Sequence, residues 1–307
     1  MATSSSTSSS SPLPGWLATL LALGVLLGLE GFARFAYQAP GEMAARALKA
    51  AGDMREDALD VTLYGTCLGE QTLDTHRLGE ALGTAGKIHN LSAAGTGPLD
   101  WYLAQSNIID PRRLDASVIL YLPGDLTRAP APWQSQAMDL ARWSDVPDIA
   151  AWSCLDAACR AEFYLRRGSF FYRYRGYLGN WLWSQLGTRA PPSNHRDFSP
   201  LDGRREKTQE AALHYLGRLV TISRDAKIPV FFVRMPERHR AGSQGGLDGQ
   251  HAQTEAWLKG LGASFLPSPV LEANAYVDDV HLNAGGRAHF SDAIGEMIAA
   301  ELTSAPR

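Results

Sequence analysis

Short apolar runs alternate with stretches of helical periodicity along most of the chain. Patterns typical of buried strands cover residues 59–65, 87–91, 116–122, 228–233 and 264–266. Apolar positions at helical spacing cover residues 69–82, 98–108, 206–226, 250–261 and 284–302. Because strands that alternate with helices are joined by right-handed crossovers, this order predicts an α/β fold with a doubly wound, mostly parallel sheet.

The first residues follow a different pattern. A Ser- and Thr-rich tract has nothing to bury, so residues 1–14 are predicted to be a disordered tail. Residues 16–29 carry no charge, and the segment 15–37 reaches the length of about 20 residues that a bilayer span needs if Glu30 and Arg34 lie at the interface. We interpret 15–37 as a single-pass membrane anchor or uncleaved signal. A cleaved signal peptide would have a basic n-region, which is missing here, and a buried core helix is the third interpretation.

Composition narrows the class of protein. The chain has 307 residues, of which 45% are hydrophobic and 20% are charged, so it can bury a real core and is neither globally disordered nor a multi-span membrane protein. Lys and Arg number 29 against 32 Asp and Glu, a net charge of −3 without a long basic stripe, which argues against a nucleic-acid partner. We expect one α/β domain over residues 50–303.

Reactive side chains stand where the predicted strands end. Cys67 follows the first strand, Gly95 the second, Gly124 and Asp125 the third, and Asp278 and His281 precede the last helix. A Cys at a strand-to-helix turn gains the helix N-terminal amides, which favour a thiolate, and an Asp three residues before a His can orient its imidazole as a base. The sequence has neither a phosphate-binding loop nor a dinucleotide fingerprint, so no cofactor is expected, and no metal ligand set is apparent.

At these residues the sequence resembles the SGNH, or GDSL-type, hydrolase superfamily over residues 57–303, most specifically in the segment 276–286. The resemblance implies a flavodoxin-like sheet, with Cys67 in the place of the nucleophilic Ser and Asp278 with His281 as its partners. Gly95 matches the glycine whose amide serves the oxyanion hole, and Gly124 and Asp125 fall in the third block. The branch it is most similar to is membrane-anchored and handles O-acyl groups on polysaccharides or wall polymers, alongside a membrane-bound acyltransferase.

Two departures from the family pattern keep two functions open. The family normally has Ser where Cys67 stands, and it has an oxyanion-hole Asn where Gly124 stands. A thiol beside a His is a competent nucleophile, so the first expectation is a Cys-His-Asp esterase or O-acyltransferase acting on acyl esters such as acetyl. The alternative is a catalytically inactive binding or assembly subunit of a membrane O-acylation system.

An insertion at about 126–203 is too long for an ordinary connection. It is rich in aromatics and contains Arg166, Arg167, Arg173 and Arg175, so it is either a helical cap on the domain or a lid or membrane-facing surface. Cys154 and Cys159 within it have a spacing that a loop disulfide can close, and three unpaired thiols are the alternative.

The side of the membrane is predicted from opposing signals. A disulfide would need an oxidising compartment. Arg34, Arg46 and Lys49 follow the anchor and favour a cytoplasmic C-terminal side. We expect an extracytoplasmic, periplasmic domain.

Overall fold

A computed structural model describes residues 15–36, 41–54, 59–83, 87–127, 136–154, 156–175, 185, 205–238 and 245–304. The predicted tail 1–14 lies outside these residues. The chain divides into two compact units, of which one comprises Met1–Gln38 with Leu165–His195 and the other Ala39–Tyr164 with Arg196–Arg307.

The larger unit contains a sheet of five parallel strands in the order β2-β1-β3-β4-β5. The strands are β1 (Asp60–Tyr64), β2 (Lys87–Asn90), β3 (Ala116–Tyr121), β4 (Val230–Arg234) and β5 (Ser264–Leu266). All five coincide with predicted strand patterns, and the doubly wound parallel fold is confirmed. The strand order reverses between β1 and β3, so these two carboxyl ends form the topological switch point.

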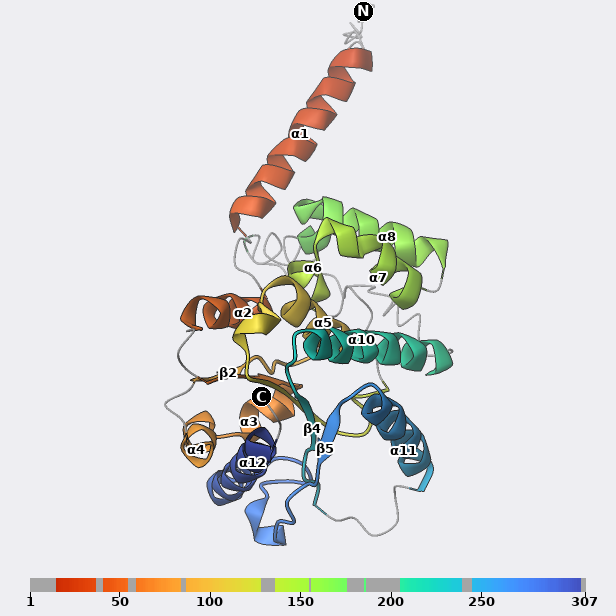
Figure 1. Cartoon of the computed structure of the whole chain (residues 1–307). Coiled ribbons are helices and arrows are strands. Elements are labelled where there is room, and N and C mark those ends of the chain that lie inside the picture. The colour runs from red at the N-terminus through yellow and green to blue at the C-terminus, as the bar shows by residue number, and fades with distance from the viewer. Residues whose placement is uncertain are drawn as a thin grey trace, which may run out of the picture. The chain divides into compact units, whose positions relative to one another are not determined.

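Alternate residues of each strand belong to separate apolar clusters on the two faces of the sheet. Val118 and Leu120 of β3 contribute to one cluster, whereas Ile119 and Tyr121 contribute to the other. The first face is covered by α3 (Cys67–Thr72), α4 (Thr75–Ala81) and α12 (Ala284–Ser304). The second is covered by α2 (Glu42–Asp53), α5 (Pro98–Asn107), α10 (Arg205–Asp225) and α11 (Gly245–Gly260) (Figure 1).

Two helices differ from the predicted pattern. The single helix expected over 69–82 is wrong, because the chain is extended at Leu73 and the Asp74 side chain accepts hydrogen bonds from the backbone N–H groups of His76 and Arg77, which begins α4. Helix α2 lies before the predicted domain start at residue 50 and was not predicted. It buries Met43 and three alanines against the second face of the sheet.

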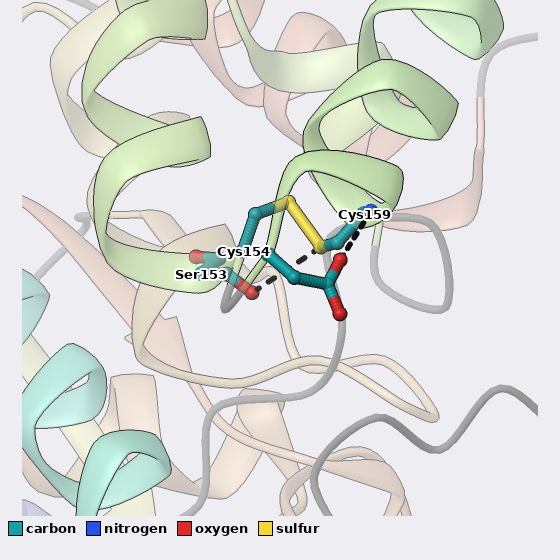
Figure 2. Close-up of a disulfide and its surroundings, with 4 residues drawn as sticks. Ser153, Cys154 and Cys159 are labelled. Atoms are coloured by element: carbon teal, nitrogen blue, oxygen red, sulfur yellow. Dashed lines mark hydrogen bonds between the residues drawn. A yellow bond between two sulfur atoms is a disulfide. The ribbon is translucent and has the colours of Figure 1, made fainter.

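The described part of the insertion is helical and contains a disulfide. It forms α6 (Ala137–Leu140), α7 (Val146–Ser153) and α8 (Ala157–Gly168), with a short 3-10 turn at Trp143–Asp145. Residues of α6 and α7 join the apolar cluster of the second face, as expected for a helical cap. Cys154 and Cys159 are bonded between α7 and α8, with Cα atoms 5.3 Å apart, so the disulfide interpretation is confirmed (Figure 2).

The smaller unit contains α1 (Gly15–Ala36). Within it, Trp16–Phe35 is long and apolar enough to cross a membrane, and most of its side chains are exposed. A membrane anchor and a signal sequence both have this character.

Candidate functional site

The turn after β1 presents Cys67 at the start of a helix. Gly65 ends the strand at a crowded place, since a Cβ there would lie 3.0 Å from both the Leu120 carbonyl oxygen and the Ser92 Oγ. Thr66 is the N-cap residue and Cys67 the first residue of α3. The Cys67 thiol is half-buried, and it is the only cysteine outside the disulfide. Cys67 is therefore neither a fully buried core residue nor part of a crosslink.

The turn after β2 is bonded to the turn after β1. The Gly65 carbonyl accepts hydrogen bonds from the Ala93 backbone N–H at 3.2 Å and from the Thr96 hydroxyl at 2.8 Å. Gly95 lies between these donors with a φ of +73°, a conformation that favours glycine. The amide of Gly95 and the N-terminus of α3 are thus carried by two turns that are joined directly.

The turn after β3 is closed by its own Asp. The Asp125 carboxylate accepts from the Leu122 backbone N–H at 2.9 Å, and the Asp125 N–H donates to the Leu122 carbonyl at 2.8 Å. Gly124 is exposed, and a Cβ built on it would meet no heavy atom of the described residues within 4 Å. The turn therefore has room for a side chain at residue 124.

Asp278 and His281 form a hydrogen-bonded pair. The Asp278 Oδ2 and His281 Nδ1 atoms are 2.7 Å apart, while Oδ1 accepts from the backbone N–H groups of Val280 and His281 at 2.9 and 2.8 Å. These two backbone donors, followed by the imidazole, lower the pKa of Asp278 to about 2. Because a carboxylate can only accept, Nδ1 carries the proton and Nε2 is left as a base.

The residues around this pair fix the loop that carries it. Asn283 accepts from the Gly286 backbone N–H at 3.0 Å at the start of α12, and its own N–H donates to the Ala275 carbonyl at 2.9 Å. A Cβ on Gly286 would lie only 2.3 Å from that carbonyl oxygen. The glycine allows the helix start and the loop to approach this closely.

Cys67 and His281 are carried by segments that pack on the same face of the sheet. Leu68 and Leu282, the next residues in each segment, belong to one apolar cluster with Leu120 of β3. Among the described residues, no hydrogen bond joins the Cys67 thiol to the His281 ring. The structure thus pairs Asp278 with His281 and the Cys67 turn with the Gly95 turn.

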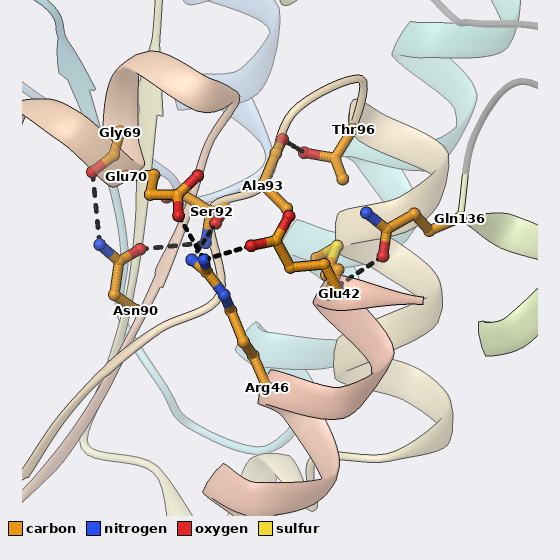
Figure 3. Close-up of polar contacts among 10 residues, drawn as sticks. Glu42, Arg46, Gly69, Glu70, Asn90, Ser92, Ala93, Thr96 and Gln136 are labelled. Atoms are coloured by element: carbon orange, nitrogen blue, oxygen red, sulfur yellow. Dashed lines mark hydrogen bonds and ion pairs between the residues drawn. The ribbon is translucent and has the colours of Figure 1, made fainter. Parts of the chain in front are cut away.

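Arg46 of α2 contacts two segments of the site. It was not identified as a site residue from the sequence. Its guanidinium donates to the Ser92 carbonyl at 2.5 Å and forms ion pairs with Glu42 at 2.6 Å and with Glu70 of α3 (Figure 3). Arg46 therefore links the Cys67 helix to the loop that leads to Gly95. The Glu42–Arg46 spacing of four, among apolar positions at helical intervals, is the signal that could have identified α2.

Ser92, which begins the turn after β2, carries a hydroxyl close to the Cys67 turn but lies in the interior. Its side chain is fully buried, and its hydroxyl has no hydrogen-bond partner among the described residues. Its backbone N–H donates to Asn90, whose side-chain amide in turn donates to the Gly69 carbonyl of α3 (Figure 3). In the described part of the chain, no group of three metal-ligating side chains is found.

Three solved structures are similar to this chain. A proposed platelet activating factor from Streptococcus pneumonia is 12% identical, with 94% of this chain and 100% of that chain covered and a TM-score of 0.42. A GDSL-like lipase from Bacteroides thetaiotaomicron is 12% identical, with 84% and 97% covered and a TM-score of 0.43. A proposed arylesterase from Agrobacterium tumefaciens is 16% identical, with 80% and 98% covered and a TM-score of 0.40.

The sequence itself matches no protein-family model and no curated protein. At the identities and TM-scores of the three structures, the likeness decides neither the family nor the activity. The function has to follow from the residues of the site.

Proposed function

We propose that this chain is a membrane-anchored hydrolase or transferase of the SGNH type, which acts on O-linked acyl groups such as acetyl through Cys67, His281 and Asp278. The observation that carries the proposal is the 2.7 Å contact between Asp278 and the Nδ1 atom of His281, which leaves Nε2 as a base. The half-buried thiol at the start of a helix is the complementary nucleophile.

The reaction follows two steps. In the first, His281 takes the thiol proton and the Cys67 sulfur attacks the acyl carbonyl carbon, while the backbone N–H groups of Cys67 and Gly95 stabilise the oxyanion. The carbon–oxygen ester bond breaks, the leaving alcohol takes the proton from His281, and a thioester remains on Cys67. In the second step, water or an acceptor hydroxyl attacks the thioester, its proton passes to His281, and the thiol is regenerated.

The substrate class follows from the resemblance seen in the sequence. An acylated polysaccharide or wall polymer would supply the ester, and a membrane-bound acyltransferase is the expected partner in the same system. The exposed apolar helix α1 supports anchoring in a membrane. The Cys154–Cys159 disulfide supports an oxidising, extracytoplasmic side for the domain.

A second function is favoured by a specific feature of the third turn. Gly124 offers no side-chain donor where the resembling family has Asn, and the loss of one oxyanion donor costs about a hundredfold to a thousandfold in turnover. The alternative is therefore an inactive subunit that uses the same turns to bind an acylated glycan or to assemble with the acyltransferase.

Acyl labelling separates the two functions. We expect the purified chain to release p-nitrophenol from p-nitrophenyl acetate and to carry an acetyl group on Cys67, detectable by mass spectrometry of the quenched protein. Cys67→Ala and His281→Ala should abolish both signals while the circular dichroism spectrum stays unchanged. Full activity in both variants would refute the enzyme assignment, and absence of labelling with retained glycan binding would support the inactive subunit.

A further inference from the structure

Glu30, near the end of α1, contacts the beginning of a second helical segment. Its Oε1 atom accepts from the Phe170 backbone N–H at 3.0 Å. Its Oε2 atom accepts from the Phe171 N–H at 3.0 Å and from the Ser169 hydroxyl at 2.8 Å. Residues 170–175 are helical, so these donors belong to the first turn, whose N–H groups have no acceptor within their own helix. A carboxylate of α1 therefore caps a helix that follows it by 140 residues.

In a bilayer, these contacts give hydrogen-bond partners to both the Glu30 carboxylate and the backbone N–H groups of the second segment. Twenty residues from Trp16 to Phe35 span about 30 Å, so Glu30 would lie about 8 Å inside the end of the apolar helix. At that depth a bare carboxylate and bare backbone N–H groups are both costly, because little water is present to bond them. The charge-assisted hydrogen bonds satisfy both, and the Arg34 side chain pairs with Glu30 at 2.9 Å. Wherever Glu30 lies in the membrane, the start of the second segment lies at the same depth.

The second segment has the composition of a membrane interface. Residues 165–175 contain four arginines, four aromatic residues and no acid. Guanidinium groups stack on these rings, with Arg175 at 3.7 Å from the Tyr172 centroid and Arg173 at 5.1 Å from that of Tyr174. Arg34 of α1 lies 4.9 Å from the Phe170 centroid. Aromatic rings partition to the headgroup region, and arginines bind lipid phosphates.

We propose that residues 165–175 form a second membrane-contact element, held by Glu30 at the boundary between the apolar layer and the headgroups and binding anionic phospholipid. The proposal rests on the proposed anchoring of α1 in a membrane, and it does not depend on the chemistry of Cys67. It assigns to part of the insertion a role separate from that of the helical cap formed by α6 and α7.

Depth-dependent quenching tests the proposal on the full chain. In a Cys67→Ser background, an environment-sensitive fluorophore is attached at Tyr174→Cys, with Phe35→Cys as the membrane reference and Glu301→Cys on α12 as the exposed reference. Each protein is reconstituted in phosphatidylcholine vesicles with and without phosphatidylglycerol, and lipids with a headgroup nitroxide are the quencher. We expect the label at 174 to be quenched as strongly as the label at 35, and more strongly with phosphatidylglycerol present.

Matched variants identify the contacts responsible. Glu30→Ala should lower the ratio of docked to undocked segment about fivefold, the change that loss of a typical helix cap produces, without changing the signal at 35. Arg173→Gln with Arg175→Gln should remove the response to phosphatidylglycerol, whereas Arg112→Gln with Arg113→Gln should leave it unchanged.

Three outcomes would overturn the proposal. If the label at 174 behaves like the label at 301 while the label at 35 is quenched, the anchor stands and the second contact is wrong. If the label at 174 resists lipid quenchers but is shielded from iodide in native membranes, a protein covers the segment instead. If the label at 35 is itself unquenched, the proposed anchoring of α1 in a membrane is wrong. This result differs from the other two, in which the label at 35 is quenched or the segment is covered by a protein.

Discussion

Gly124→Asn should increase the activity of this protein. The third turn lacks the side-chain oxyanion donor that the resembling family has at this place, and the structure has room for it. In the described part of the chain, a Cβ on Gly124 meets no heavy atom within 4 Å, and the backbone of Gly124 is not in the left-handed region. Its carbonyl accepts a hydrogen bond from the Thr127 N–H, which an added side chain leaves in place. The substitution therefore adds a donor without strain.

The size of the gain follows from two opposing contributions. A preorganised oxyanion donor stabilises the transition state by about 2.7 to 4 kcal/mol. Ordering an exposed Asn side chain costs about 1 kcal/mol. The difference of about 1.7 to 3 kcal/mol corresponds to an increase of about 20- to 160-fold in kcat.

Initial rates with p-nitrophenyl acetate, measured for the wild-type protein and for Gly124→Asn, test this expectation. Gly124→Ala is the matched control, because it adds the Cβ and the backbone restriction but no donor. If Gly124→Asn folds normally and is no faster than Gly124→Ala, residue 124 does not face the oxyanion. A large gain from an undetectable wild-type rate would instead show a site that lacks only this donor.

Four further substitutions or conditions test other parts of the structure. Arg46→Gln should lower the free energy of unfolding in urea by about 1.5 to 3 kcal/mol and reduce kcat more than it changes KM. If the substitution of a distant surface Arg by Gln changes stability and kcat equally, Arg46 has no positioning role. Ser92→Ala should keep full activity and lower the free energy of unfolding by less than about 1 kcal/mol, because the hydroxyl has no partner among the described residues; an inactive variant that folds normally would contradict a purely structural role. The double variant Cys154→Ser with Cys159→Ser should have a free energy of unfolding about 2 kcal/mol lower than the wild type. Dithiothreitol should lower the value of the wild type by the same amount, and an effect of dithiothreitol on the double variant would contradict this explanation. Since the pKa of Asp278 is lowered to about 2, its bond to the imidazole should persist above the unfolded value of 3.8 and be lost as the pH falls towards 2, which the NMR signal of the Asp278 carboxyl carbon reports; a carboxyl inflection at or above pH 3.8 would contradict this.

The strands and most helices of the domain were predictable because their apolar spacing is local. β1, β3 and β4 are short runs rich in β-branched and aromatic residues, and β1 ends at the turn residue Gly65. The break between α3 and α4 was not predicted, because Leu73 keeps the apolar period and only the cap formed by Asp74 divides the helix. Helix α2 was missed because three of its four buried positions are alanines, whose small side chains give a weak apolar pattern.

The sequence by itself determined the order of strands and helices and the apolar N-terminal segment. It also determined that Cys67 is left over when Cys154 and Cys159 pair, and that Asp278 lies close to His281. These depend on neighbours within a few residues, where backbone geometry leaves few alternatives. Only the tertiary structure decided that Arg46 links the Cys67 helix to the Gly95 loop, that Ser92 is buried, and that Glu30 caps a helix far along the chain. Such contacts join segments 24 to 141 residues apart, so they exist only once the sheet and its helices have brought distant parts of the chain together.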